Sequence, residues 1–259
     1  MAGRVALVTG GGRGIGRAIA LAFAADGFAV AVGARTLAQV EDTAEGARRA
    51  GAKAFAVSLD TTDAAAVAAA VARVAQELGP VDVLVNNAGV AESAPFARTD
   101  PAMWDRHFDV NVRGPYLATR AVLPGMLLRR WGRVINVASL AGLVGSPYVT
   151  AYTASKHALV GLTRALATEV GGKGVTVNAL CPGFVATDMV WNGARNVVAR
   201  TGKSFDDAVQ AMADLNPGRR LLEPEEVAAA AVRLIRDGDL NGEIVVLDGT
   251  APRPTRSDR

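Results

Sequence analysis

Short, β-branched runs bounded by glycine alternate with longer, alanine-rich stretches along this chain, and this alternation restricts the fold more than any other feature. The apolar runs include VALVTG at 5–10 and VDVLVNN at 81–87, and GRAIALAFAADG at 16–27 is one of the alanine-rich stretches. Repeated strand–helix–strand units predict an α/β fold with a parallel sheet. Because the runs are apolar throughout, we expect helices to cover both faces of that sheet.

The same pattern predicts the individual elements. Four apolar residues of the stretch at 63–79 recur at three- and four-residue steps, which places them on one helical stripe facing the sheet. These are Val67, Val71, Val74 and Leu78. We expect strands at 4–10, 28–34, 53–60, 81–87, 132–139, 174–183 and 242–249. We expect helices at 16–27, 37–51, 63–79, 101–130, 151–170 and 224–236.

No linker, repeat or charge run divides the chain, so we expect one domain over residues 1–259. One stretch, residues 186–217, interrupts the rhythm between a strand and the last helix. Ser204 followed by Asp207 can cap a short helix there, carrying Val209, Met212 and Leu215. An insertion of this length beside a sheet is typical of a substrate lid or binding wall. The alternative is a peripheral helical hairpin that only packs.

Charge and cysteine content narrow the class of protein. The formal net charge of +3 comes from 28 basic and 25 acidic residues mixed along the chain, which does not favour a nucleic-acid partner. Three arginines and two prolines in the tail at 251–259 are more typical of a frayed terminus than of a binding arm.

Cys181 is the single cysteine, which excludes an intramolecular disulfide and a cysteine-based metal cluster and fits a reducing cytoplasm. We expect it to be a small, buried apolar residue rather than a nucleophile. The N-terminus lacks a signal-peptide pattern, and no run of about 18 apolar residues occurs, so we expect a soluble, cytoplasmic protein without membrane association.

A glycine cluster follows the first strand and opens the first helix. Its spacing, TGxxxGxG, places Gly10, Gly12, Gly14 and Gly16 where the backbone must turn tightly. The N-terminus of the following helix offers free N–H groups and a partial positive charge, which suit a pyrophosphate. A tight turn without a ligand is the alternative for the glycines taken alone.

Tyr152 and Lys156 are four residues apart and therefore lie on one face of the expected helix. An ammonium beside a phenol favours the phenolate, so we expect the pKa of Tyr152 to move down from its ordinary value of about 10. The phenol could then exchange a proton with a reacting oxygen. Ser139, thirteen positions earlier, ends an apolar strand. A hydroxyl there can stabilise negative charge on a substrate oxygen, although a simple strand-end cap is the alternative.

The glycine spacing, the NNAG segment at 86–89 and the Tyr152–Lys156 pair together resemble the short-chain dehydrogenase/reductase family over essentially the whole chain. The resemblance implies a single Rossmann-like, doubly wound sheet, a nicotinamide dinucleotide and a homotetramer. It also implies a catalytic tetrad of Asn111, Ser139, Tyr152 and Lys156, in which Asn111 holds a water that links the lysine to solvent.

The resemblance implies a cofactor site as well. Asp60 matches the family aspartate at the adenine ring, although Thr61 follows it where an apolar residue is usual. Val185 and Thr187 match the residues that hold the nicotinamide carboxamide, and Lys156 those at the nicotinamide ribose. The expected cofactor residues are Gly10, Gly12, Arg13, Gly14, Ile15, Gly16, Arg35, Asp60, Asn87, Ala88, Gly89, Tyr152, Lys156, Pro182, Gly183, Val185 and Thr187.

The end of the second strand favours NADP(H) over NAD(H). Ala34 stands where an acidic residue would bind the ribose 2′-hydroxyl, and Arg35 follows it. Arg13 could approach a 2′-phosphate from the other side, and arginines form charge-assisted hydrogen bonds to phosphate. The alternative is that both arginines are solvated and the cofactor is NAD(H).

The histidines support neither a metal site nor a hydrolase triad. His157 follows Lys156 directly, so it points about 100° away from the catalytic face. His107 has no second histidine, serine nucleophile or carboxylate pair arranged around it in the sequence.

The expected substrate wall is apolar. It comprises 91–96, 140–148 and the insertion with Met189, Trp191 and Met212. The chain is similar to 3-oxoacyl-thioester reductases and bacterial polyketide ketoreductases, which implies a small-molecule carbonyl substrate with a hydrophobic body. Arg129 and Arg130 beside Trp131 could attract an acidic carrier protein, or form a solvated helix end. Alternative functions are an NAD(H)-dependent alcohol dehydrogenase for another substrate class, or a non-catalytic dinucleotide-binding regulator.

Overall fold

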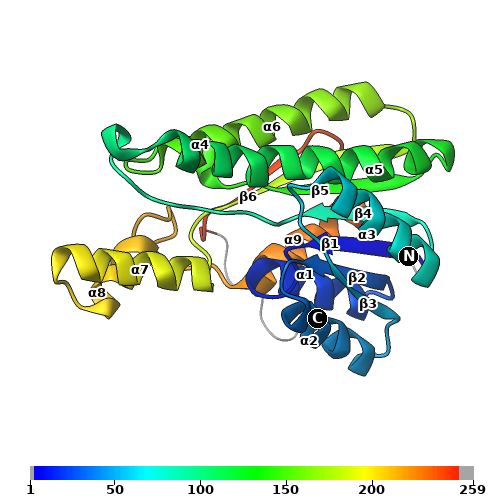
Figure 1. Cartoon of the computed structure of the whole chain (residues 1–259), viewed down its shortest axis with the longest axis horizontal. Coiled ribbons are helices and arrows are strands. Elements are labelled where there is room, and N and C mark those ends of the chain that lie inside the picture. The colour runs from blue at the N-terminus through cyan, green and yellow to red at the C-terminus, as the bar shows by residue number, and fades with distance from the viewer. Residues whose placement is uncertain (1–2, 251–259) are drawn as a thin grey trace.

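A seven-stranded parallel sheet forms the centre of the molecule in a computed structural model that describes residues 3–250. The strands lie in the order β3-β2-β1-β4-β5-β6-β7, so the sheet is wound in both directions from β1 and β4. The single-domain, doubly wound fold is therefore confirmed (Figure 1). The strands are β1 Val5–Thr9, β2 Ala29–Ala34, β3 Ala54–Ser58, β4 Val81–Asn86, β5 Gly132–Val137, β6 Val175–Pro182 and β7 Ile244–Leu247.

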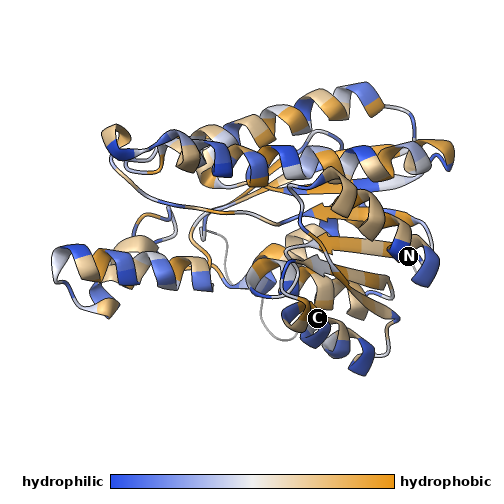
Figure 2. Ribbon diagram, in the orientation of Figure 1, coloured by the Kyte–Doolittle hydropathy of each residue, from blue (hydrophilic) through white to orange (hydrophobic). Residues whose placement is uncertain are grey.

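Helices cover both faces of the sheet. Alternate residues of β1 show how, because Ala6 and Val8 pack toward α1, α2 and α9, whereas Val5 and Leu7 pack toward α3, α5 and α6. The strands are apolar almost throughout, while the helices are amphipathic (Figure 2). The helices are α1 Gly14–Ala25, α2 Leu37–Arg49, α3 Ala64–Glu77, α4 Pro101–Phe108, α5 Gly114–Leu128, α6 Thr150–Val170, α7 Asp188–Thr201, α8 Phe205–Ala213 and α9 Pro224–Arg236.

The predicted stripe of the third helix is confirmed. Val67 and Val74 are buried against the sheet, and Val71 and Leu78 are partly buried beside them. The carboxylate of Asp63 caps the helix, accepting hydrogen bonds from the backbone N–H groups of Ala65 and Ala66.

The helical region expected at 101–130 contains an irregularity that its sequence did not suggest. Between α4 and α5 the backbone forms a π-helical turn, Asp109–Arg113, and Asn111 lies within it. π-turns inside α-helices are rare and occur frequently at functional sites. Here the turn brings the buried side chain of Asn111 against the backbone of Val90, in the loop after β4.

The insertion at 186–217 forms a hairpin of two helices, α7 and α8, which projects to one side of the sheet (Figure 1). The predicted cap of α8 is confirmed, since the Ser204 hydroxyl accepts from Asp207 N at 3.1 Å and donates to the Asp207 carboxylate at 2.7 Å. Leu215 lies beyond the helix end and is largely exposed. The sequence analysis did not identify α7, although Val190 and Ala194 are buried one turn apart.

No helix between residues 3 and 250 is both long enough and apolar enough to span a membrane. The tail at 251–259, expected to be frayed, lies outside the described residues.

Candidate active site

The glycine loop and the NNAG segment meet at the carboxyl ends of β1 and β4, where the winding of the sheet reverses and where open α/β sheets bind ligands. Gly10 has a φ of +64° and Gly14 a φ of +52°, both in the left-handed region that favours glycine. A Cβ at Gly10 would lie 2.8 Å from Ala88 Cα. Glycine is therefore required at Gly10, both by its backbone conformation and by the close approach of the two segments.

The Thr9 side chain, which the sequence analysis did not assign, ties these segments together. Its hydroxyl accepts from the backbone N–H groups of Asn87 and Ala88 and donates to Val85 O. The Asn87 amide in turn donates to the carbonyls of Thr9 and Gly10, each at 3.0 Å. The T of TGxxxGxG was the available signal for this contact.

The start of α1 fits the pyrophosphate of a dinucleotide. Its N-cap residue, Arg13, forms no side-chain hydrogen bond to the free backbone N–H groups, so these groups can bind an anion. The first turn carries no acidic residue that would repel that anion. A cleft of about 320 Å³ opens beside this turn, lined among others by Gly14, Thr187, Asp188 and Trp191. Thr187 approaches Gly14 so closely that a Cβ on the glycine would lie 3.1 Å from Thr187 Cγ2.

At the end of β2, Arg35 is exposed and follows Ala34, with no carboxylate at the strand end itself. The pKa of Asp60 is lowered mainly by hydrogen bonds from the Thr62 backbone N–H and hydroxyl. The nearby charge of Arg35 lowers it further. Arg13 reaches Asp188 in an exposed ion pair at 3.4 Å. Such a pair contributes little to stability, so Arg13 can exchange Asp188 for another anion at small cost.

Tyr152, Lys156 and Ser139 come together at the carboxyl end of β5. Lys156 Nζ lies 5.7 Å from the centroid of the Tyr152 ring and donates to Val137 O at 2.9 Å. Ser139 lies close enough to Tyr152 for its side chain to affect the pKa of the phenol, and its hydroxyl accepts from Ala141 N at 3.1 Å. The strand-end cap and the contact with the tyrosine are thus both present at Ser139.

The pKa of Tyr152 differs from the sequence expectation. Burial raises it above its ordinary value, and the Ser139 side chain opposes that rise without reversing it. Burial also lowers the pKa of Lys156 to about 8. The expected lowering of the tyrosine pKa by the ammonium is therefore wrong for this structure, because loss of hydration dominates and the opposing contribution comes from Ser139 rather than from Lys156.

Asn111 is fully buried, and both the oxygen and the nitrogen of its amide form hydrogen bonds. Its Oδ1 accepts from Val90 N at 2.9 Å, and its Nδ2 donates to Val90 O and to the Ser155 hydroxyl, each at 3.0 Å. Ser155 then donates to Tyr152 O at 2.7 Å. The sequence analysis gave Ser155 no role. The structure places it between the asparagine and the tyrosine, with no exposed surface.

Pro182 ends β6, and the chain then runs from Gly183 to the start of α7. Val185 forms an isolated parallel bridge with Leu222, and the Thr187 hydroxyl donates to Val185 O at 3.2 Å. Val185 is buried, whereas Thr187 faces the cleft at the glycine loop. The structure thus brings this segment to the same edge of the sheet as the glycine loop.

The surroundings of the two histidines and of the cysteine do not indicate a metal site or a nucleophile. His107 is buried edge-on to Tyr152, and its Nε2 accepts from Glu92 N while its Nδ1 lies 2.7 Å from Met103 O, which together fit a neutral ring. His157 is exposed. Cys181 is buried, and burial raises the pKa of its thiol. Between residues 3 and 250, no three His, Cys, Asp or Glu side chains cluster as metal ligands.

Large apolar side chains are exposed on the segments of the expected substrate wall. They are Phe96, Val144, Tyr148 and Met189. The backbone carbonyl of Tyr148, a non-glycine residue with a φ of +65°, accepts from Ala94 N at 2.8 Å. That bond joins the loop after β4 to the loop before α6.

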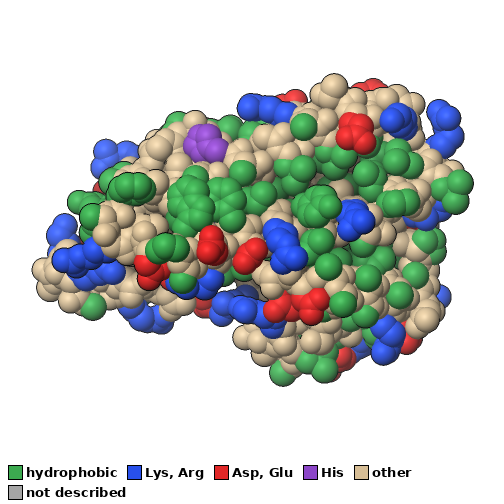
Figure 3. Space-filling view, turned by 45° about the horizontal axis from the view of Figure 1, so that its top comes forward, with side chains coloured by type: hydrophobic (Ala, Val, Ile, Leu, Met, Phe, Trp, Pro, Cys, Tyr) green, Lys and Arg blue, Asp and Glu red, His purple; other side chains and the backbone are tan. Residues whose placement is uncertain are grey.

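The arginines considered for a carrier protein lie elsewhere. Arg129 donates to Val81 O and is paired with Asp82 at the amino end of β4, the opposite edge of the sheet from Ser139. Trp131 is stacked by Arg4 and Arg133 instead. On the face drawn in Figure 3, basic and acidic side chains are interspersed.

Comparison with known proteins identifies the family. The family described as "short chain dehydrogenase" matches residues 4–197, so the chain belongs to the short-chain dehydrogenases. It is 39% identical to nodulation protein G of Azospirillum brasilense, covering 96% of this chain and 98% of that one. It is 41% identical to the short-chain reductase protein NovJ of Streptomyces niveus, covering 96% and 94%.

Among solved structures, a variant of actinorhodin polyketide ketoreductase with NADPH superposes with a TM-score of 0.92 at 35% identity, covering 96% of this chain and 98% of that one. The protein is thus an oxidoreductase of the short-chain dehydrogenase/reductase family with ketoreductase relatives.

Proposed function

We propose that this protein is an NADP(H)-dependent ketoreductase that interconverts a ketone with an apolar body and its secondary alcohol. The observation that carries the proposal is the meeting of Tyr152, Ser139 and Lys156 at the sheet edge that also holds the glycine loop. The bound nicotinamide supplies or accepts the hydride in this chemistry.

The four polar residues divide the remaining work. Ser139 donates a hydrogen bond to the substrate carbonyl oxygen and stabilises the negative charge that develops there. The Tyr152 phenol gives its proton to that oxygen during reduction, and the phenolate takes the proton back during oxidation. Lys156 holds the nicotinamide ribose, and Asn111 positions a water that returns protons from solvent.

The raised pKa of Tyr152 suits the direction of reduction. A phenol that stays protonated through neutral pH remains able to donate, whereas oxidation requires the phenolate. Reduction should therefore be the faster direction near neutral pH, and oxidation should accelerate as the pH rises.

The choice of NADP(H) rests on charge at the adenosine ribose. Arg35 is exposed at the end of β2, where a 2′-phosphate would accept charge-assisted hydrogen bonds, and Ala34 offers the ribose no carboxylate. The NADPH in the actinorhodin ketoreductase structure is in keeping with this choice. The proposed cofactor site is further supported by Asn87, which is hydrogen-bonded to the glycine loop, and by Thr187, which adjoins Gly14.

The substrate class rests on the apolar wall and on the named relatives. A polyketide-like ketone or a 3-oxoacyl thioester combines one carbonyl with a hydrophobic body, which suits the exposed Phe96, Val144 and Tyr148. The hairpin of α7 and α8, with Met189 and Trp191, would close over such a substrate as a lid. We further propose a cytoplasmic homotetramer, testable by light scattering in solution.

The test is NADPH oxidation by the wild type and by Tyr152→Phe, with a panel of cyclic ketones, polyketide-like diketones and 3-oxoacyl thioesters. We expect turnover with at least one apolar ketone, and a loss of at least about a thousandfold in kcat/KM for the variant. NADPH affinity should change little, because the ring remains. A wild type that binds NADPH tightly but reduces none of these carbonyls would instead support a regulatory dinucleotide-binding protein.

A further inference from the structure

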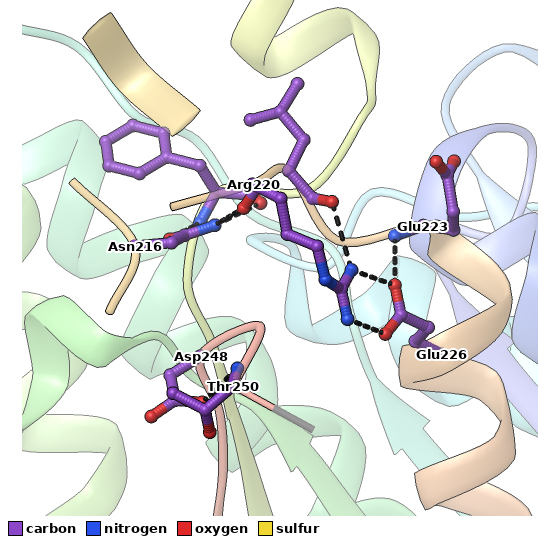
Figure 4. A network of polar contacts seen from close by, with 8 residues as sticks. Asn216, Arg220, Glu223, Glu226, Asp248 and Thr250 are labelled. Carbon is purple, nitrogen blue, oxygen red and sulfur yellow. Dashed lines mark hydrogen bonds and ion pairs between the residues drawn. The ribbon is translucent and has the colours of Figure 1, made fainter. Parts of the chain in front are cut away.

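Asn216 lies where the chain returns from the α7–α8 hairpin to the sheet, and its side chain is almost fully buried, with 1% exposed. Its Oδ1 accepts from Phe184 N at 2.8 Å. Its Nδ2 donates to Phe184 O at 3.0 Å and to Arg220 O at 2.6 Å. One amide therefore holds both backbone polar groups of Phe184, the residue just before the Val185–Thr187 segment. Its bond to Arg220 is drawn in Figure 4.

The contact is also tight in shape. A Cβ at Gly183 would lie 2.1 Å from Asn216 Oδ1, so the amide occupies the space that a side chain at Gly183 would need. Phe184 lies beyond the end of β6, where the sheet no longer fixes the backbone. Leu222 continues the attachment, since its N–H donates to Phe184 O and its carbonyl accepts from Ala186 N.

The loop that carries Asn216 is itself anchored. Arg220 donates to both carboxylate oxygens of Glu226, at 2.7 and 2.6 Å, and Glu226 also accepts from Glu223 N at 2.8 Å. These side chains are mostly buried, and Glu226 lies in the first turn of α9 (Figure 4). Bidentate pairs of this kind fix orientation as well as distance. Asn216 thus contacts Phe184 from a rigid support rather than from a loose loop.

We propose that Asn216 is a positioning residue that fixes the Phe184–Thr187 segment and thereby sets the affinity for the nicotinamide cofactor and the rate of hydride transfer. The inference rests on the proposed function, in which Val185 and Thr187 hold the carboxamide. Because Asn216 ends the α7–α8 hairpin, the same amide links the lid to the cofactor segment. A small displacement of such a segment lowers the rate through misorientation of the reacting groups.

Asn216→Asp tests the proposal. It preserves the oxygen that accepts from Phe184 N, and it replaces the Nδ2 donor with an oxygen that faces the carbonyls of Phe184 and Arg220. Asn178→Asp is the matched control. Asn178 lies in β6, is equally buried, accepts from Glu243 N at 2.9 Å and donates to Leu240 O at 2.8 Å, so the loop that it holds is the one before β7 and not the cofactor segment. Both variants should lower the melting temperature by similar amounts.

We expect only Asn216→Asp to raise the Kd for NADPH and lower kcat, each about tenfold. In the protein without added cofactor, it should also accelerate hydrogen exchange in peptides covering 183–189. Asn216→Ala should act in the same direction and replaces Asn216→Asp if the carboxylate prevents folding. Equal effects of Asn216 and Asn178 variants on Kd and exchange would overturn the proposal. Absence of turnover in the wild type would refute the proposed function, while Kd and exchange would still decide the role of Asn216.

Discussion

The two ends of the candidate site are built in opposite ways. At the catalytic end, Asn111, Ser155 and Lys156 are buried and held by hydrogen bonds of 2.7–3.0 Å to one another or to the backbone. At the ribose-phosphate end, Arg13 and Arg35 are exposed, and Arg13 forms a single ion pair at 3.4 Å.

This difference follows from what each end has to do. Proton transfer requires groups fixed to within a fraction of an ångström before the substrate arrives, and buried hydrogen bonds provide that order. Recognition of a phosphate requires charge, which an exposed arginine supplies without any cost of burial. Substitutions at the catalytic end should therefore change stability and rate together, whereas substitutions at the phosphate end should change cofactor preference alone.

The largest expected effect concerns the buried ammonium of Lys156. Its pKa is about 8 in the folded protein and about 10.5 in an exposed lysine, so between these values the unfolded chain binds more protons. Stability from this group therefore rises with pH over that window, by at most about 3 kcal/mol. At pH 7 the wild type has to bury a charged amine, which Lys156→Met does not. We therefore expect the difference in the free energy of unfolding between Lys156→Met and the wild type to shrink by this amount from pH 7 to pH 10.5.

Urea denaturation of both proteins at several pH values, without cofactor, measures this difference, and the groups that do not interact with Lys156 cancel. A difference that stays constant with pH would mean that the amine has the same pKa folded and unfolded. Activity provides a second comparison of the two proteins. Lys156→Met should lose most of its turnover at every pH, whereas its stability relative to the wild type should change with pH.

Arg35→Asp should have the next largest effect, at the other end of the site. The carboxylate would repel a 2′-phosphate and could accept from the ribose hydroxyls, so the ratio of kcat/KM for NADPH to that for NADH should fall at least about thirtyfold. The melting temperature should stay unchanged, since Arg35 is exposed.

Arg49→Asp provides the matched charge change at the far end of α2, in an exposed pair with Glu45. It should leave the cofactor ratio as in the wild type. If Arg35→Asp also leaves that ratio unchanged, the cofactor is chosen by other residues and the argument from charge fails.

The sequence predicted the parts of the site that depend on local spacing better than those that depend on long-range contacts. Tyr152, Lys156 and the glycine loop follow from local spacing, because helix periodicity and turn geometry act over a few residues. The roles of Ser155 and Asn216 depend on contacts with residues 44 and 32 positions away, which spacing cannot indicate. The π-turn at Asn111 and the raised pKa of Tyr152 likewise depend on packing around the finished fold.

Ser155→Ala has the smallest expected effect and sharpens the comparison at the buried end. Removing the hydroxyl leaves one Asn111 N–H buried without its acceptor and frees the carbonyl of Tyr152, which should cost about 1–3 kcal/mol of stability. If Ser155 aligns the asparagine with the tyrosine, kcat should also fall about tenfold, equivalent to about 1.4 kcal/mol of the barrier, with little change in KM for NADPH.

Thr163→Val separates alignment from stability. Thr163 lies on the same helix, is fully buried, accepts from the Asn136 amide at 2.8 Å and donates to Leu159 O at 2.8 Å, so it reproduces the bonding of Ser155 about three turns away from the tyrosine. Loss of the Thr163 hydroxyl should cost similar stability and leave kcat intact. Equal losses of kcat in both variants would mean that buried order anywhere along α6 matters, and that Ser155 has no special place in the catalytic end.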